Sequence, residues 1–162
     1  MEETHMEKKH VSDSVVEKVC QLRPGHLNGA GRLFGGQLMK WIDEVGGLVG
    51  IRHAQSDIVT ASVDNLKFMR GAGLKDMLVM IGKITYTGRT SMEVRVDTYV
   101  ENVADGMRRP INRAYLVLVA VDEQGRPRPV PGLILDTEGE RAEWEAAIKR
   151  KEMRARRQKE GF

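Results

Sequence analysis

Residues 28–47 read NGAGRLFGGQLMKWIDEVGG, and they lie at the centre of the predicted fold. Apolar residues recur at helical spacing through this stretch and just beyond it: Leu38, Ile42, Val45 and Val49. The spacing predicts one buried helix from about Gly35 to His53. Glycine inside a helix costs about 1 kcal/mol relative to alanine, and a charge such as Asp43 on a mostly apolar helix must be paired, hydrated or in use. The double glycine and the carboxylate therefore make this helix a candidate functional element.

Beyond this helix the hydrophobic pattern changes from a period of 3.6 to a period of two. Stretches rich in β-branched residues predict four strands, at 58–69, 77–88, 91–102 and 112–121, and residues 122–125 predict a turn after the fourth. The third stretch alternates strictly between apolar and polar residues, which predicts a strand with one face in water. Residues 114–121 are apolar on both faces, as expected of a central strand. Before the helix, residues 15–22 predict a shorter strand that Pro24 and Gly25 end.

The last part of the chain, residues 137–162, is rich in Ala, Glu, Lys and Arg and predicts a long, mostly exposed helix with a frayed end. Thr137 and Glu140 have the spacing of a capping box at its start. The predicted fold class is α+β: an antiparallel sheet wrapped around one central helix, plus a C-terminal surface helix. Three parts are expected, namely a flexible N-terminal lead at 1–11, one domain at 12–136 and a charged C-terminal helix with a basic tail at 137–162.

Length and composition limit the classes of protein that fit this sequence. A chain of 162 residues has the size of a single domain, and its one cysteine, Cys20, excludes an intrachain disulfide. The N-terminus alternates charges and has no apolar segment of the secretory type, and no stretch approaches the ~20 apolar residues of a membrane span. We therefore expect a cytoplasmic protein. The apolar positions left over on the sheet predict a dimer that extends the sheet or covers its rim.

Basic residues are concentrated near the C-terminus, where residues 149–159 read KRKEMRARRQK. Such a run is able to contact nucleic acid, an acidic surface or a phosphorylated ligand, or it forms a solvated tail. We favour the solvated tail. No aromatic residues are interleaved to stack on bases, so the expectation is that the chain has no nucleic-acid partner.

Three separate motifs resemble one known family. Residues 26–43, HLNGAGRLFGGQLMKWID, resemble the signature of the acyl-CoA thioester hydrolases of the YciA and cytosolic acyl-CoA hydrolase type, which have the hotdog fold. In that family an asparagine, a Leu-Phe-Gly-Gly turn and a Trp-x-Asp helix follow in this order. ASVDNLKFM at 61–69 and TGRTSMEVRV at 87–96 are also similar. The resemblance covers about residues 12–125 and makes residues 12–136 a hotdog thioesterase domain.

The sequence departs from the family pattern at two places. Residues 70–76 read RGAGLKD, where the family usually has a proline and then Gly-Asp after this strand. This loop is expected near the mouth of the substrate site, so we carry over no acyl-chain preference. The stretch VADGMRRPIN at 103–112 is also unusual, which leaves the strand ends there undefined.

The resemblance implies hydrolysis of fatty acyl-CoA to a free acid and coenzyme A. Thioester hydrolysis requires an activated water or a carboxylate nucleophile, together with donors for the oxygen that gains charge. Asp43 is the candidate base or nucleophile, and Gly36, whose N–H is free at a helix start, is the candidate oxyanion donor. By the resemblance Asn28 orients the carbonyl or the water. The alternatives are a buried structural carboxylate, a glycine that relieves crowding, and a turn asparagine.

Helix geometry relates two of these candidates. Asp43 follows Gly36 by seven residues, which places it about 20° away around the helix and ~10 Å farther along the axis. One chain's Asp43 is therefore too distant to serve its own Gly36. The family's sites lie at a dimer seam, and its members are commonly hexamers built as trimers of dimers. A homodimer, and a hexamer built from it, is what the resemblance implies for this chain.

Coenzyme A carries phosphates, which need cationic and backbone donors. Gly88-Arg89-Thr90-Ser91 offers a relaxed turn, a guanidinium and two hydroxyls, and Arg70 with Lys75 adds charge. Without the resemblance this motif is only a polar hairpin. No cofactor is expected, because coenzyme A is part of the substrate and product. No metal is expected either, since the four histidines are isolated from one another in the sequence.

Two rival functions remain open from the sequence. A hotdog dehydratase acting on acyl thioesters would use a catalytic histidine, and His26 and His53 flank the predicted helix. A non-catalytic module would sense acyl-CoA without turning it over, and the basic tail would suit it. The combination of Asn28 and Asp43 favours hydrolysis over both, because binding alone needs no carboxylate beside an acyl group.

Overall fold

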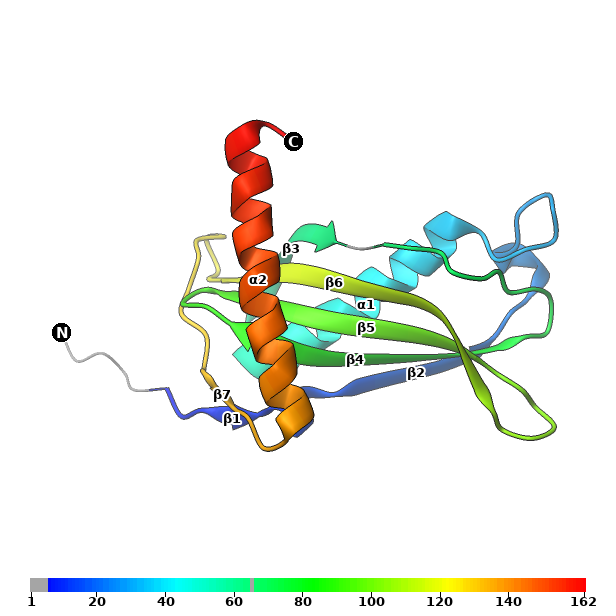
Figure 1. Cartoon of the computed structure of the whole chain (residues 1–162), viewed down its shortest axis with the longest axis horizontal. Coiled ribbons are helices and arrows are strands. Elements are labelled where there is room, and N and C mark those ends of the chain that lie inside the picture. Colours follow the sequence, from blue (N-terminus) through cyan, green and yellow to red (C-terminus); the bar gives the residue numbers. More distant parts are fainter. Residues whose placement is uncertain (1–5, 65) are drawn as a thin grey trace.

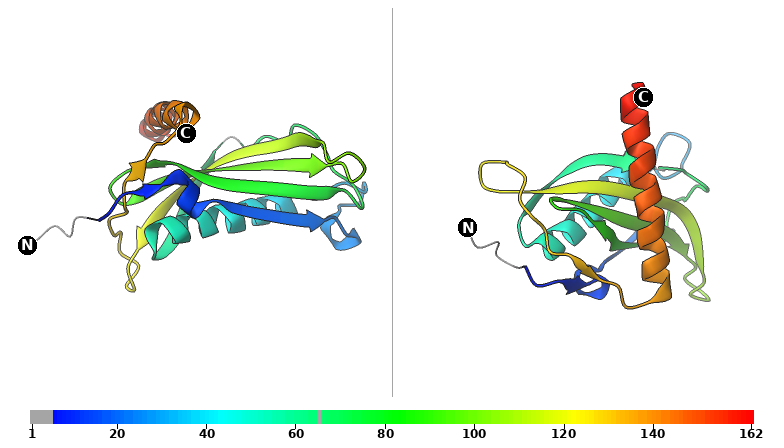
Figure 2. Two further views of the ribbon diagram at one scale, coloured as in Figure 1. Left: turned by 90° about the horizontal axis from the view of Figure 1, so that it is seen from below. Right: turned by 60° about the vertical axis from the view of Figure 1, so that its left-hand side comes forward.

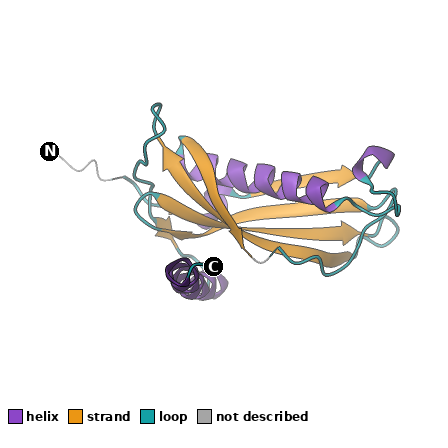
Figure 3. Ribbon diagram, turned by 90° about the horizontal axis from the view of Figure 1, so that it is seen from above, coloured by secondary structure: helices purple, strands orange, loops and turns teal. Residues whose placement is uncertain are grey.

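A five-stranded antiparallel sheet wraps one long helix in the computed structural model, which describes residues 6–64 and 66–162 (Figure 1). The helix, α1, spans Gly35–Ala54, and a second helix, α2, spans Glu138–Glu160. In spatial order the strands are Val16–Gln21 (β2), Met77–Thr87 (β4), Ser91–Glu101 (β5), Arg108–Val121 (β6) and Asp57–Asp64 (β3). The two helices lie on opposite faces of the sheet (Figure 2; Figure 3). The predicted α+β class and its central helix are confirmed.

Helix α1 forms where the apolar spacing predicts it. It starts after Phe34, which has extended dihedrals, and ends at Gln55, which adopts the left-handed conformation and donates its N–H to the Ile51 carbonyl at 2.8 Å. Two of its glycines allow close packing on the sheet. A Cβ on Gly50 would lie 2.6 Å from Leu118 Cδ1, and one on Gly46 would lie 3.0 Å from Leu116 Cδ2. These two glycines are structural.

The predicted strands match at 15–22, 77–88 and 91–102 but not at 58–69. Strand β3 stops at Asp64, and the chain then turns back toward the start of α1, where Phe68 packs against Gly35. Although β3 comes first of the four strands along the chain, it pairs with β6 and forms one edge of the sheet. Strand β6 begins at Arg108, which resolves the strand end that the sequence left undefined.

The prediction that strand 91–102 has one face in water is wrong. Glu93 and Asp97, both on the polar face of β5, are only 1% and 5% exposed. Helix α2 lies across that face of the sheet, and the Trp144 ring packs against the Tyr86 ring at a centroid distance of 4.4 Å (Figure 1). The capping box of α2 is confirmed, because the Thr137 hydroxyl accepts the N–H of Glu140.

Ion pairs hold α2 on the sheet, so the solvated-tail interpretation is wrong for three of the basic residues. Arg150 Nη2 lies 2.7 Å from Glu93 Oε1, and Arg154 lies 3.3 Å from both Glu93 and Asp64. Arg157 pairs with Asp64 at 3.1 Å. Burial disfavours the Arg150 guanidinium, yet its hydrogen bond to Glu93 and the charge of that carboxylate raise its pKa above the usual value. The helix stays regular to Glu160 instead of fraying earlier.

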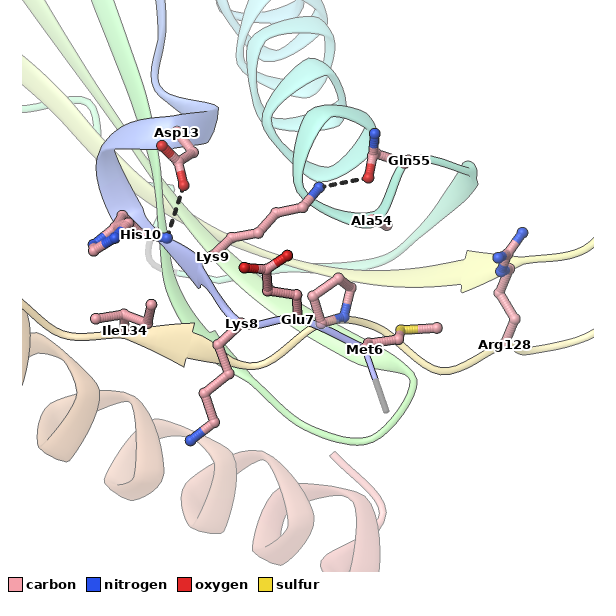
Figure 4. Close-up of a pocket in the computed structure, with 11 residues that line it drawn as sticks. Met6, Glu7, Lys8, Lys9, His10, Asp13, Ala54, Gln55, Arg128 and Ile134 are labelled. Atoms are coloured by element: carbon pink, nitrogen blue, oxygen red, sulfur yellow. Dashed lines mark hydrogen bonds between the residues drawn. The ribbon is translucent and has the colours of Figure 1, made fainter. Parts of the chain in front are cut away.

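The N-terminal segment packs against the rest of the chain from Lys8 onward, whereas residues 1–5 of the predicted lead lie outside the described residues. Its strand β1, Lys9–His10, pairs in parallel with β7, Leu133–Ile134. The Lys9 ammonium donates to the His53 carbonyl and to Gln55 Oε1, both at 2.9 Å, at the C-terminal end of α1 (Figure 4). Short 3-10 helices at Val11–Ser14 and Pro24–His26 complete the secondary structure described.

Candidate functional site

The Asp43 carboxylate faces the edge strand. Asp43, Gly47 and Gly50 form one stripe of α1, and the two glycines pack against Ile58 of β3. No side chain therefore stands between the stripe and the strand at those two positions. The Thr60 hydroxyl donates to Asp43 Oδ1 at 2.8 Å. Asp43 is exposed in the single chain, and its partner is a side-chain hydroxyl, not the backbone group or arginine expected of a buried structural carboxylate.

Thr60 is a site residue that the sequence analysis missed. Its strand has a register shift next to it, since Thr60 lies opposite Leu118 while Ser62 lies opposite Val117. Ala61 is the additional residue, and such bulges re-aim the side chains beside them. A threonine in a strand is ordinary, and residues 58–63 contain two hydroxyl side chains, Thr60 and Ser62, so the sequence does not single out Thr60. Its role can be assigned only once the partner of the strand is known.

The start of α1 offers free backbone donors. The N–H groups of Gly35 and Gly36 have no protein acceptor among the residues that the structure describes. Gly36 also has a packing role, because a Cβ there would lie 2.6 Å from Cε1 of the Phe34 ring. The three atoms nearest to such a Cβ all belong to Phe34, so the structure gives no support to the explanation that Gly36 relieves crowding against the sheet.

Asn28 forms a local turn just before this helix start. Its side-chain oxygen accepts the N–H groups of Ala30 at 2.9 Å and Arg32 at 3.2 Å, as expected of a turn asparagine. The side-chain NH₂ group makes no hydrogen bond within residues 6–64 and 66–162, so it is free to donate. The Phe34 N–H donates to the His26 carbonyl at 2.9 Å and fixes the turn against the helix start.

Arg70 lies at the same end of the molecule as Asn28. The loop that contains it is attached to the Asn28 turn, because the Leu33 N–H donates to the Ala72 carbonyl at 2.7 Å. Asn28, the N-terminal turn of α1 and the loop around Arg70 therefore form one continuous surface. Asp43 stands on the same helix face as Gly36, ~10 Å along the axis, as the regular helix requires.

The turn Gly88-Arg89-Thr90-Ser91 lies elsewhere. It joins β4 to β5, and its carbonyls hold the chain after β6: the Val130 N–H donates to the Arg89 carbonyl at 2.9 Å. Met92, which follows the turn, packs near Gly50 in the last part of α1. Gly50 is fourteen residues after Gly36, which is ~21 Å along the helix axis. Within one chain the structure does not bring this turn together with Gly36 or Arg70.

Neither candidate histidine is available for acid–base chemistry beside Asp43. His53 is fully buried and its Nε2 lies 2.7 Å from the Pro131 carbonyl oxygen, and burial lowers its pKa. His26 Nδ1 accepts the Arg23 N–H at 3.0 Å, and its ring packs edge-on against Trp41. Among the described residues no hydrogen bond joins either ring to Asp43. This arrangement gives no support to the dehydratase alternative.

Within residues 6–64 and 66–162, no helix is long and apolar enough to cross a membrane. The same residues contain no group of three or more His, Cys, Asp or Glu side chains arranged to hold a metal ion.

Known proteins are similar to this chain over most of its length. Residues 30–106 match the family described as the thioesterase superfamily. An uncharacterized acyl-CoA thioester hydrolase, YkhA of Bacillus subtilis (strain 168), is 33% identical over 153 residues, which cover 94% of this chain and 89% of that protein. The cytosolic acyl coenzyme A thioester hydrolase of Mus musculus is also 33% identical, over 91% of this chain, but the match spans only 40% of its length.

Solved structures agree with the sequence relatives. A hexameric acyl-CoA thioesterase without ligand is 39% identical with a TM-score of 0.90, over 94% of this chain and 97% of that one. The acyl-CoA hydrolase of Staphylococcus aureus, in complex with butyryl coenzyme A, coenzyme A and coenzyme A disulfide, is 32% identical with a TM-score of 0.90, over 95% and 94%. That hydrolase has also been solved as variants which its own numbering names Asp43Ala, Asn28Ala and Thr60Ala.

Proposed function

Since this chain belongs to the thioesterase superfamily, as a hotdog-fold acyl-CoA thioester hydrolase, we propose that it cleaves fatty acyl-CoA with Asp43 as the catalytic carboxylate. One observation carries this proposal: the Thr60 hydroxyl of the edge strand β3 donates to one oxygen of the exposed Asp43 carboxylate on α1. The other oxygen, Oδ2, makes no hydrogen bond within the part of the chain that the structure describes. It is free to accept a proton from water, or to attack the carbonyl carbon itself.

The oxygen of the thioester carbonyl needs donors as it gains negative charge. We assign this role to the N–H of Gly36 at the positive end of the α1 dipole, together with the side-chain NH₂ of Asn28. The local turn supports this assignment. It occupies the Asn28 side-chain oxygen as an acceptor, so the NH₂ group, which is a donor, is the part of the side chain left for the substrate. The residues replaced by alanine in the solved variants of the S. aureus hydrolase are an asparagine, an aspartate and a threonine, and their numbers in that protein equal those of Asn28, Asp43 and Thr60 here, which further supports this set.

Two chains are needed to assemble such a site. Gly36 and Asp43 of one chain are ~10 Å apart along α1, too far to act on one carbonyl group. Strand β3 and the outer side of α1 expose four large apolar residues, between 39% and 51%: Leu48, Ile51, Val59 and Val63. Exposed apolar edge strands are normally covered by another chain. We propose a homodimer across β3 that places one chain's Gly36 opposite its partner's carboxylate, and a trimer of such dimers, as in the hexameric relative.

Subunit complementation tests the shared site. A mixture of Asn28→Ala and Asp43→Ala chains, after subunit exchange, forms hybrid seams in which one of the two sites is intact. We expect thiol release from butyryl-CoA to recover to a substantial fraction of the wild-type rate, although each variant alone is nearly inactive. The control is the same exchange between two Asp43→Ala preparations. Activity that stays at the level of the single variants after verified exchange would mean that each site lies within one chain.

A second test separates the two roles of Gly36. We expect Gly36→Ala to lower the rate with butyryl-CoA by about 10²-fold, because a methyl group at this position displaces the carbonyl by about 1 Å. The added methyl also meets the Phe34 ring at 2.6 Å, so the double variant Gly36→Ala/Phe34→Ala is the matched control. If the only role of Gly36 is to leave room for the Phe34 ring, the double variant should recover the wild-type rate with butyryl-CoA. We expect the double variant to stay slow, because the substrate oxygen still meets the methyl group.

Other parts of the proposal rest on resemblance alone. Arg70 and the turn Gly88-Arg89-Thr90-Ser91 remain predicted phosphate contacts for coenzyme A, and they would serve one ligand only if they came from different chains. We retain the predictions that no cofactor is required, that nucleic acid is not a partner, and that the enzyme acts in the cytoplasm. A module that senses acyl-CoA is the alternative, and it would bind butyryl-CoA without releasing a thiol.

A further inference from the structure

Three large apolar side chains lie at the first turns of α1 and remain about half exposed. Their exposed fractions lie between 48% and 56%, and they are Phe34, Met39 and Phe68. Apolar side chains scattered singly on a surface need no explanation, but a contiguous group of this size marks a binding surface. The group adjoins the helix start to which we assign the oxyanion, so its occupant should be part of the substrate.

The two aromatic rings flank the helix start directly. A Cβ placed on Gly36 would touch the Phe34 ring, and one placed on Gly35 would lie 3.4 Å from Cζ of Phe68. Met39 follows Gly36 by three residues and precedes Asp43 by four, so it lies on the same side of α1 between them. A carbonyl group bound at Gly36 therefore has one ring on either side. Its hydrocarbon substituent has the flexible Met39 side chain alongside.

The remaining surface around this helix start has the opposite chemistry. Arg32 lies across Gly71, and neither Arg32 nor Arg70 forms an ion pair with a residue that the structure describes. Guanidinium groups suit the phosphates and amides of coenzyme A, whereas two phenyl rings and a thioether offer no hydrogen-bond donors. An acyl chain is the one part of the substrate that needs none.

From this division we infer that Phe34 and Phe68 determine acyl-chain specificity, by forming the two walls of a slot along which the acyl chain runs away from the thioester. The inference rests on the proposed function and extends it to the choice of substrate. A wider slot would lose contact with every carbon it holds, and a single methylene in an apolar pocket changes kcat/KM by about tenfold or more. The rings should therefore matter most for substrates that reach along the whole slot.

The test compares Phe34→Ala and Phe68→Ala with wild type on butyryl-, octanoyl- and palmitoyl-CoA. We expect each variant to lose about tenfold or more in kcat/KM for octanoyl-CoA relative to butyryl-CoA, mainly through a higher KM. Phe34→Leu, which keeps an apolar wall, should recover most of the loss. The matched control is Phe162→Ala, which truncates the same side chain at a position that is 90% exposed at the end of the chain.

Three outcomes would overturn the inference. Equal losses on all three substrates would mean that the rings position the helix start and do not read the chain. Dissociation of the assembly, seen by sedimentation velocity, would identify the rings as a contact between copies of the chain. If wild type is active and the variants have the same ratio of kcat/KM for octanoyl-CoA to kcat/KM for butyryl-CoA as wild type, the rings do not determine specificity. The proposed function would then stand. A wild type that hydrolyses none of the three substrates would instead refute the proposed function itself.

Discussion

Replacement of Asp43 by alanine is expected to lower kcat for acyl-CoA hydrolysis by about 10²- to 10⁴-fold, the contribution typical of a positioned acid–base group. The fold should be unaffected, because the carboxylate is exposed and its only hydrogen bond in the described structure is to Thr60. Thiol release from butyryl-CoA measures the rate, and an unchanged unfolding midpoint in urea shows that the variant is folded.

Two further variants separate chemistry from position. Asp43→Asn keeps an acceptor for the Thr60 hydroxyl but neither takes up a proton nor attacks, so it should be as slow as Asp43→Ala. Thr60→Val removes the hydroxyl at nearly constant volume. A hydrogen bond to a charged group is worth about 1.5–3 kcal/mol, so the rate should fall by about 10- to 100-fold.

The matched control is Glu44→Ala, which removes the next carboxylate along the same helix. Glu44 is also exposed, but it forms no hydrogen bond to β3 within the described residues. Its loss should leave the rate within about twofold of wild type, as is usual for a surface change away from the chemistry. Full activity in Asp43→Ala, or an equal loss in Glu44→Ala, would contradict the assigned mechanism.

The parts of the site that the sequence predicted are those set by local geometry. Helical spacing alone gives α1 its buried face, places Gly36 at its start and fixes the ~10 Å to Asp43. Asn28 is likewise a local feature, because its turn closes within four residues. Family resemblance was still needed to choose a catalytic role for these residues over a structural one.

The parts that the sequence did not predict depend on pairing between distant segments. Alternation along 58–69 does not say which strand will lie alongside, and β3 crosses to the far side of β6. Thr60 reaches Asp43 only because of that crossing and the adjacent bulge. The same limit explains the end of β3 at Asp64, since the departure of the chain toward Gly35 is a tertiary contact.

Charge was the other source of error, because a charged residue was assumed to be hydrated. The sequence analysis assigned both the polar face of β5 and the basic run of α2 to solvent. In the structure these two surfaces pack against each other. The composition of either segment alone does not reveal this arrangement. Their mutual burial predicts that the charged contact matters more for stability than ordinary surface pairs do.

Glu93→Ala is therefore expected to destabilise the protein by about 3–5 kcal/mol, the cost typical of removing one partner from a buried ion pair. The Glu93 side chain is only 2% exposed, and it accepts hydrogen bonds from Arg150 at 2.7 Å and from the Thr85 hydroxyl at 2.7 Å. Urea unfolding monitored by circular dichroism measures the change. Arg157→Ala is the matched control. Its guanidinium is 53% exposed, and loss of its pair with Asp64 should cost no more than about 1 kcal/mol.

The double variant Glu93→Leu/Arg150→Met identifies the source of the loss. If an uncompensated charge causes it, removal of both charges should recover much of the stability that Glu93→Leu alone loses, because apolar replacements of buried pairs are often neutral. Part of the loss should remain, since Arg150 also pairs with Glu143 at 2.7 Å and packs 3.8 Å from the centre of the Tyr115 ring. Equal stability in Glu93→Ala and Arg157→Ala would show instead that water reaches the cluster, and that α2 is held by its apolar contacts.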